Sequence, residues 1–70
     1  MKISARNQFP GTVKAVTDGA VMAEVVVDLD TGGELVAAIT LQSAHHLGLE
    51  PGKHVVAVIK STEILIATED

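Results

Sequence analysis

The sequence has 70 residues, a net charge of −4 from nine acidic and five basic residues, and no cysteine. A chain of this length has room for one domain, expected over residues 1–70, and disulfide cross-links are excluded. The negative charge disfavours binding to nucleic acid or anionic lipid. No apolar run is long enough to span a bilayer and the N-terminus does not lead into a signal peptide, so we expect a cytoplasmic protein with no membrane partner.

Hydrophobic residues make up 47% of the chain, and most of them are valine, alanine, leucine or isoleucine, with Phe9 as the only aromatic residue. Branched aliphatic side chains favour strands. A domain this small hides only about 60% of its surface on folding and usually needs disulfides, a metal or neighbours to be stable. We therefore expect an obligate oligomer.

The first eight residues contain a group of hydrogen-bond donors. Ser4, Arg6 and Gln8 occupy every second position, so in an extended backbone their side chains share one face. Such donors suit an anion that carries oxygen atoms. The pair Lys60-Ser61 supplies a second set of donors, and we expect the fold to bring the two sets together.

A long first strand is expected to continue from Gln8 to Val16, with a bend or bulge at Pro10-Gly11. Asp18-Gly19 is typical of a two-residue hairpin turn. The next strand, residues 21–29, has the clearest alternation in the chain, and the residues predicted to share its inner face are Val21, Ala23, Val25, Val27 and Leu29.

A turn at residues 31–33 leads to a third strand with Leu35, Ala37 and Ile39 facing inward. Thr40 is placed to cap a short helix over residues 41–47, and Gly48 to end it. Glu50-Pro51-Gly52-Lys53 has the residues of a type II turn.

Two further strands are expected, over residues 54–60 and 64–67, with a polar corner between them. The order strand, strand, strand, helix, strand, strand predicts a mainly β fold: a five-stranded OB-like barrel with one short helix between strands three and four.

Several stretches resemble one family along essentially the whole chain. They are Met1-Lys2-Ile3-Ser4-Ala5-Arg6-Asn7-Gln8, Gly11, Gly19-Ala20-Val21, Ala23-Glu24-Val25, Gly32-Gly33 and Val58-Ile59-Lys60-Ser61. Together they are similar to the molbindins, small cytoplasmic molybdate-binding proteins built from a single Mop domain. Similar domains occur in molybdate-responsive regulators and importer ATPases, but this sequence shows neither of those other portions. The resemblance therefore implies the free-standing storage or buffering form.

The resemblance also implies a homohexamer, a trimer of dimers, that binds molybdate or tungstate at subunit interfaces. The oxyanion-binding residues that it implies in one subunit are Ser4, Ala5 through its backbone, Arg6, Lys60 and Ser61. Thr40 and Ser43 of an adjacent subunit would complete the pocket. No catalytic cofactor is implied, and the metal, bound as its oxyanion, needs no protein ligand.

Molybdate at neutral pH is an unprotonated tetrahedral dianion, so a pocket made only of donors matches all its oxygens and disfavours the proton-bearing phosphate. Two alternatives remain open. Thr40 and Ser43 could serve only as capping residues. The guanidinium of Arg6 could pair with an acidic neighbour while only its backbone touches the ligand.

Other metal sites have little support in the sequence. His45 and His46 are adjacent and would point about 100° apart on a helix, so together with His54 we interpret them as structural or solvent-facing. A calcium loop beginning at Asp28 is rejected, because its twelfth position is Ile39 where a bidentate glutamate is required.

Three classes of function are weighed. An enzyme is not expected, because the sequence has no cysteine, nucleophile-elbow serine or glycine-rich phosphate loop. An OB-type module for single-stranded nucleic acid is the alternative to oxyanion binding, but it would need stacked aromatic residues in a basic groove. A purely structural oligomerisation unit is the third possibility.

Overall fold

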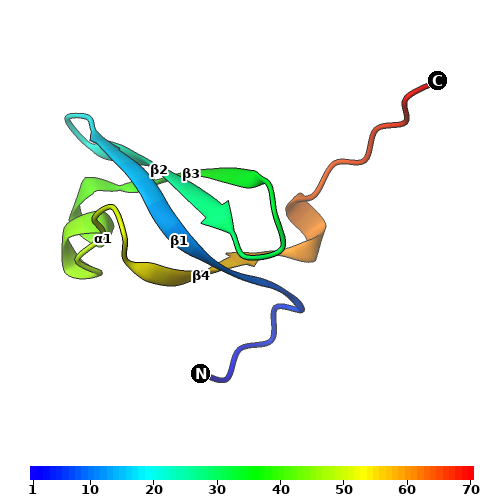
Figure 1. Cartoon of the computed structure of the whole chain (residues 1–70), viewed down its shortest axis with the longest axis horizontal. Helices are drawn as coiled ribbons and strands as arrows, with labels where there is room; N and C mark the ends of the chain where they lie inside the picture. The colour runs from blue at the N-terminus through cyan, green and yellow to red at the C-terminus, as the bar shows by residue number, and fades with distance from the viewer.

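The computed structural model describes residues 1–70 and shows one antiparallel sheet of four strands in the order β3-β2-β1-β4 (Figure 1). A short helix, α1, follows β3, and one turn of 3-10 helix, η1, follows β4. The elements are β1 (Asn7–Asp18), β2 (Met22–Leu29), β3 (Glu34–Thr40), α1 (Leu41–His46), β4 (His54–Ile59) and η1 (Ser61–Glu63). Neither helix has the length and apolar character needed to cross a lipid bilayer.

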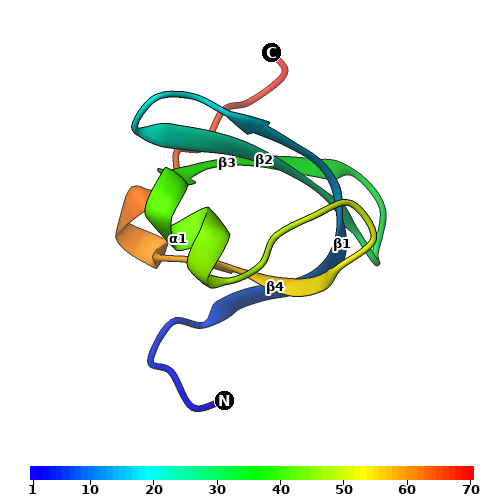
Figure 2. The same ribbon diagram turned by 90° about the vertical axis from the view of Figure 1, so that its left-hand side faces the viewer.

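The sheet curls on itself, so that the four strands form an open half-barrel (Figure 2). The long strand β1 makes this possible because it pairs with β4 along its first half and with β2 from Gly11 onward. The predictions of a mainly β fold and of a short helix between the third and fourth strands are confirmed.

The core lies inside the curl and is small. Val13, Val25 and Val27 are buried and form its centre. The predicted alternation of β2 is confirmed for Ala23, Val25 and Val27, which are all buried. An apolar groove of about 220 Å³ remains open beside them, and only apolar side chains from all four strands and from the segment after α1 line it. The half-barrel therefore exposes part of its own interior.

Gly11 lies where β1 changes partners and has no room for a side chain. A Cβ at this position would lie 2.5 Å from the carbonyl oxygen of Asp28 and 2.7 Å from Cγ1 of Val27. We expect Gly11→Ala to lower the free energy of unfolding by about 3 kcal/mol, since the clash involves backbone that pairs in the sheet. Urea unfolding followed by circular dichroism measures this. Gly33→Ala is the control: nothing lies within 4 Å of its Cβ position, and only its φ of +88° opposes the change, at about 1–2 kcal/mol. Equal losses in the two variants would contradict the steric argument.

The irregularity predicted at Pro10-Gly11 was placed wrongly. Pairing between β1 and β4 is continuous from Asn7 to Thr12, and the bulge lies at Lys14, between Val13 and Ala15. The carbonyl of Pro10 accepts from the Asp30 N–H at 3.0 Å, beyond the end of β2. The proline nitrogen, which has no hydrogen to donate, lies on the same side of the strand, so its missing donor removes no hydrogen bond from the sheet. The bulge shifts the alternation by one residue, and both Val13 and Val16 therefore pack on the core.

The hairpin turn predicted at Asp18-Gly19 is also displaced. Asp18 pairs with Ala23 in the sheet, and the Gly19 N–H donates to the Met22 carbonyl at 2.7 Å. Ala20 and Val21 are therefore the central residues of the turn. Glycine is needed at position 19 for close approach, because a Cβ there would lie 2.8 Å from the Met22 carbonyl oxygen.

The local signals around α1 are confirmed. Thr40 caps the helix, its hydroxyl oxygen accepting from the Ser43 N–H at 3.1 Å. Gly48, with φ +63°, ends it: the N–H groups of Gly48 and Leu49 donate to the carbonyls of His45 and Ala44, which is the Schellman arrangement. The type II turn at 50–53 is also present, with Gly52 at φ +94°.

The predicted fifth strand does not form within this chain. Residues 64–67 pair with no strand, and beyond η1 the C-terminal segment runs away from the sheet (Figure 1). Leu65 and Ile66 are 95% and 87% exposed. The apolar pattern of this segment led to the prediction of a strand, but the segment has no pairing partner in its own chain. The outer edges of β3 and β4 also stay unpaired. The five-stranded barrel is corrected here to a four-stranded half-barrel.

Candidate functional site

A cleft of about 440 Å³ lies where the N-terminal segment meets the end of β4 and the start of η1. The N-terminal segment forms one wall, and the end of β4 with the start of η1 forms the other. Eight residues line the cleft: Ile3, Ser4, Ala5, Arg6, Val58, Lys60, Ser61 and Thr62. The chain therefore brings two donor-bearing segments together although more than fifty residues separate them.

Five predicted site residues line this one cleft: Ser4, Ala5, Arg6, Lys60 and Ser61. Three lining residues were not predicted. Thr62 adds a third hydroxyl, and its position directly after Lys60-Ser61 in a polar turn was a signal that could have found it. Ile3 and Val58 are apolar and carried no such signal.

One side-chain to backbone hydrogen bond and one backbone to backbone hydrogen bond hold the walls of the cleft. Asn7 Nδ2 donates to the carbonyl of Ile59 at 3.2 Å, which joins the start of β1 to the end of β4. The Glu63 N–H donates to the Lys60 carbonyl at 3.0 Å, which closes η1 and fixes the backbone that carries Lys60 and Ser61.

The expectation that Ser4, Arg6 and Gln8 share the face of an extended strand was wrong in part. β1 begins only at Asn7, and the backbone bends at Ser4 and Arg6. Alternation therefore does not govern this segment. Gln8 turns back instead, and its Nε2 donates to the carbonyl of Ala5 at 2.6 Å. Gln8 thus supports the cleft wall and does not line the cleft.

The cationic groups of the cleft have no acidic partner within the chain. Arg6 and Lys60 are exposed, and the two ion pairs that the chain forms, Lys14 with Glu34 and His45 with Asp18, both lie elsewhere. The hydrogen bond and charge of Glu34, with the charge of Asp28, raise the pKa of Lys14. Positive charge and hydroxyl donors therefore remain available at the cleft, as an oxyanion requires.

Thr40 and Ser43 do not reach this cleft. They lie at the start of α1, at the other end of the half-barrel from η1 (Figure 1). The Thr40 hydroxyl donates to Ser43 Oγ at 2.7 Å while accepting from the Ser43 N–H. The capping role of Thr40 is thus present, and the hydroxyl proton of Ser43 is left free for another acceptor. Within one chain the two predicted groups of site residues stay apart.

The three histidines do not gather into a metal centre. Nε2 of His45 lies 3.5 Å from Oδ2 of Asp18, Nδ1 of His54 lies 3.4 Å from the hydroxyl of Thr12, and His46 is exposed. No group of three or more histidine, aspartate or glutamate side chains is placed to hold a metal ion.

Comparison with known proteins gives a consistent result. The TOBE domain model matches residues 3–66. Molybdenum-pterin-binding protein 3 of Clostridium pasteurianum is 47% identical over 66 residues, which cover 94% of this chain and 97% of that protein.

Two solved structures share the fold. A molybdate-binding protein from Sporomusa ovata has a TM-score of 0.90 at 48% identity, with 97% of this chain and 100% of that chain covered. The cytoplasmic molybdate-binding protein ModG, solved with molybdate bound, has a TM-score of 0.84 at 57% identity, covering 87% of this chain and 43% of that chain. The resemblance seen in the sequence is confirmed, and the chain belongs to the TOBE-domain family, among its Mop or molbindin members.

Proposed function

We propose that this protein binds molybdate, and tungstate in the same way, as intact oxyanions. The observation that carries the proposal is the cleft in which Ser4-Ala5-Arg6 meets Lys60-Ser61, with no acidic side chain in its lining. The names of the relatives support it, since the Sporomusa ovata and ModG proteins are described as molybdate-binding and the clostridial protein as molybdenum-pterin-binding.

The cleft suits an anion that can only accept hydrogen bonds. Lys60 supplies a compact charge, Arg6 a second one, and the hydroxyls of Ser4 and Ser61 can each direct a proton at an oxygen. Molybdate and tungstate carry no proton at neutral pH, so every contact can be favourable. Monohydrogen phosphate could satisfy its own O–H only by turning a serine or threonine hydroxyl of the cleft into an acceptor, which removes a donor from the anion and costs binding energy.

The site is completed in an assembly of identical subunits, a hexamer built as a trimer of dimers. Thr40 and Ser43 of a second subunit are the residues that would close the open side of the cleft. The exposed apolar segment Ile64–Ala67 and the unfilled apolar groove suit each other. In this proposal the C-terminal segment pairs with a partner copy and completes a five-stranded barrel there.

The role that follows is binding without catalysis, in a single Mop domain over residues 1–70. The relatives are described as binding proteins and not as enzymes. Storage or buffering of the oxyanion in the cytoplasm is the corresponding cellular task, and ModG is described as cytoplasmic. The nucleic-acid alternative lacks comparable support, because the chain offers Phe9 alone for base stacking.

Isothermal titration of the purified protein with four anions tests this proposal. We expect molybdate and tungstate to bind with similar affinity, sulfate more weakly because of its smaller size, and phosphate at least about tenfold more weakly because its proton takes up a hydroxyl of the cleft that would otherwise donate to the anion. Phosphate binding as tightly as molybdate would refute the donor-only site. Absence of heat with molybdate and tungstate would refute the function.

A further inference from the structure

A second hollow, of about 490 Å³, lies at the α1 end of the molecule. Six residues line it: Ala20, Val21, Thr40, Leu41, Gln42 and His45. The hollow thus combines Thr40, a predicted site residue, with His45, which was not predicted to belong to a site. Its walls come from the β1–β2 turn and from α1, which both lie at the left-hand end of the molecule in Figure 1 and are joined where the Leu41 N–H donates to the Val21 carbonyl at 2.8 Å.

A carboxylate stands beside this histidine. Oδ2 of Asp18, the last residue of β1, lies 3.5 Å from Nε2 of His45, and both side chains are about half or more exposed, at 53% and 67%. The negative charge of Asp18 opposes the approach of an anion to the hollow. An imidazolium at His45 would offset that charge, and His45 is the group placed to do so.

No other ion pair involves His45. Other charged or titratable groups lie on α1, on the loop that follows it, and on β2 and β3, which pack against it. They are His46, Glu24, Asp28, Glu34, Glu50 and Lys53. None of them forms an ion pair with His45. Asp28 and Glu34 are paired opposite each other in the β2–β3 ladder, at the end away from α1, and Lys53 Nζ donates to the Leu47 carbonyl at 2.5 Å.

We propose that His45 is a further residue of the oxyanion site, in the half that Thr40 supplies, where it offsets the charge of Asp18 next to a bound tetrahedral dianion. This inference rests on the proposed function and adds to it the pair of Asp18 and His45, in which Asp18 positions the imidazole. Asp18 holds the imidazole at the rim of the hollow, and His45 shields the dianion from the carboxylate. Affinity for molybdate is then expected to be higher when the His45 imidazole carries a proton, while the dianion keeps its own charge.

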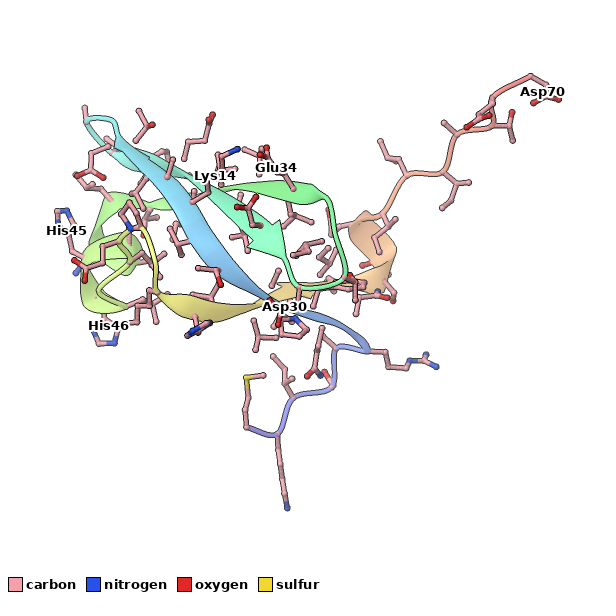
Figure 3. The ribbon with its side chains drawn as sticks, in the orientation of Figure 1. Lys14, Asp30, Glu34, His45, His46 and Asp70 are labelled. Atoms are coloured by element: carbon pink, nitrogen blue, oxygen red, sulfur yellow. The ribbon has the colours of Figure 1, made fainter.

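The matched control is the neighbouring residue on the same helix. His45 and His46 project from α1 in different directions (Figure 3), and only His45 lines the hollow. Glutamine keeps a hydrogen-bond donor but cannot become a cation. His45→Gln and His46→Gln therefore remove the same kind of side chain at two places, of which only the first lines the hollow and lies beside Asp18.

Molybdate titration calorimetry at about pH 6 and about pH 8 tests the inference, because histidine changes its charge between those values. The unaltered protein should bind about three- to fivefold more tightly at the lower pH, as an exposed charge pair allows. His46→Gln should keep this difference and His45→Gln should lose it. Asp18→Asn should raise the affinity at the higher pH by about the same factor.

A His45→Gln variant that retains the pH profile of the unaltered protein would overturn the role of His45, while molybdate binding itself would stand. Absence of binding in the unaltered protein at both pH values would instead overturn the proposed function. The two failures are therefore distinguishable in one set of titrations.

Discussion

Lys60→Ala is expected to weaken molybdate binding by about 10- to 150-fold, the range that one hydrogen bond to a charged group covers. Lys60 is exposed, lines the cleft with Ser4 and Arg6, and has no acidic partner in the chain that its removal would disturb. Its ammonium group is therefore free to contact the dianion. Isothermal titration with molybdate measures the loss, and size-exclusion chromatography with light scattering should show an unchanged oligomer.

Lys14→Ala is the control for this experiment because it removes the same charge at a distance from the cleft. Lys14 lies in β1 and pairs with Glu34 on the outside of the sheet (Figure 3). This exposed pair contributes little to stability, and we expect molybdate affinity to change less than about twofold. An equal loss in both variants would mean that total charge, and not the position of Lys60, governs binding.

Removing residues 64–70 is expected to abolish the assembly. Ile64, Leu65 and Ile66 are 41%, 95% and 87% exposed in the single chain. Burying such side chains contributes about 1.5–3 kcal/mol each, and in the proposed assembly they fill the apolar groove of a partner. Sedimentation velocity at micromolar concentration should show monomers, and molybdate affinity should fall more than about tenfold because the site then lacks its second subunit.

The control for the truncation is a chain that ends at Ala67. It also loses Glu69 and Asp70 but keeps the apolar segment, and we expect it to assemble normally. If the chain without residues 64–70 fails to fold, the full-length double variant with Leu65→Asp and Ile66→Asp tests the same role of this segment in assembly. Intact oligomers without residues 64–67, or with both aspartates, would disprove the role of this segment in assembly.

The sequence predicted best those features that depend on neighbouring residues. The cap at Thr40, the helix end at Gly48 and the turn around Gly52 each need only a few adjacent side chains, and all three are present. The inward face of β2 was predictable from Ala23 onward, because strand alternation is a local pattern with a period of two. Val21, also predicted to face inward, lies in the turn before β2 and is 72% exposed.

Features that depend on pairing were predicted less well. The pattern of Ile64–Ala67 indicates an extended segment but not its partner, and no strand of the same chain pairs with it. Likewise Pro10-Gly11 suggested a bulge that lies at Lys14, because the register follows from burying both Val13 and Val16.

For the candidate site, too, the features that depend on side-chain type were predicted well, and those that depend on how the chain folds were not. The two donor segments could be named from their side chains, and the structure places them around one cleft. The alternation argument for Gln8 failed because bends precede β1 and alternation holds only in a strand. The hollow shared by Thr40 and His45 could not be predicted, since it depends on how the β1–β2 turn lies beside α1.

The hydrogen bond from Gln8 to the Ala5 carbonyl has a consequence for the kinetics of capture. Ordering a free N-terminal segment around a ligand would cost about 1–2 kcal/mol per residue in backbone entropy. Because the bond from Gln8 folds the segment back beforehand, part of that entropy is already lost when the chain folds. At the proposed site we therefore expect an arriving anion to meet a prearranged cleft and to associate without a slow loop closure.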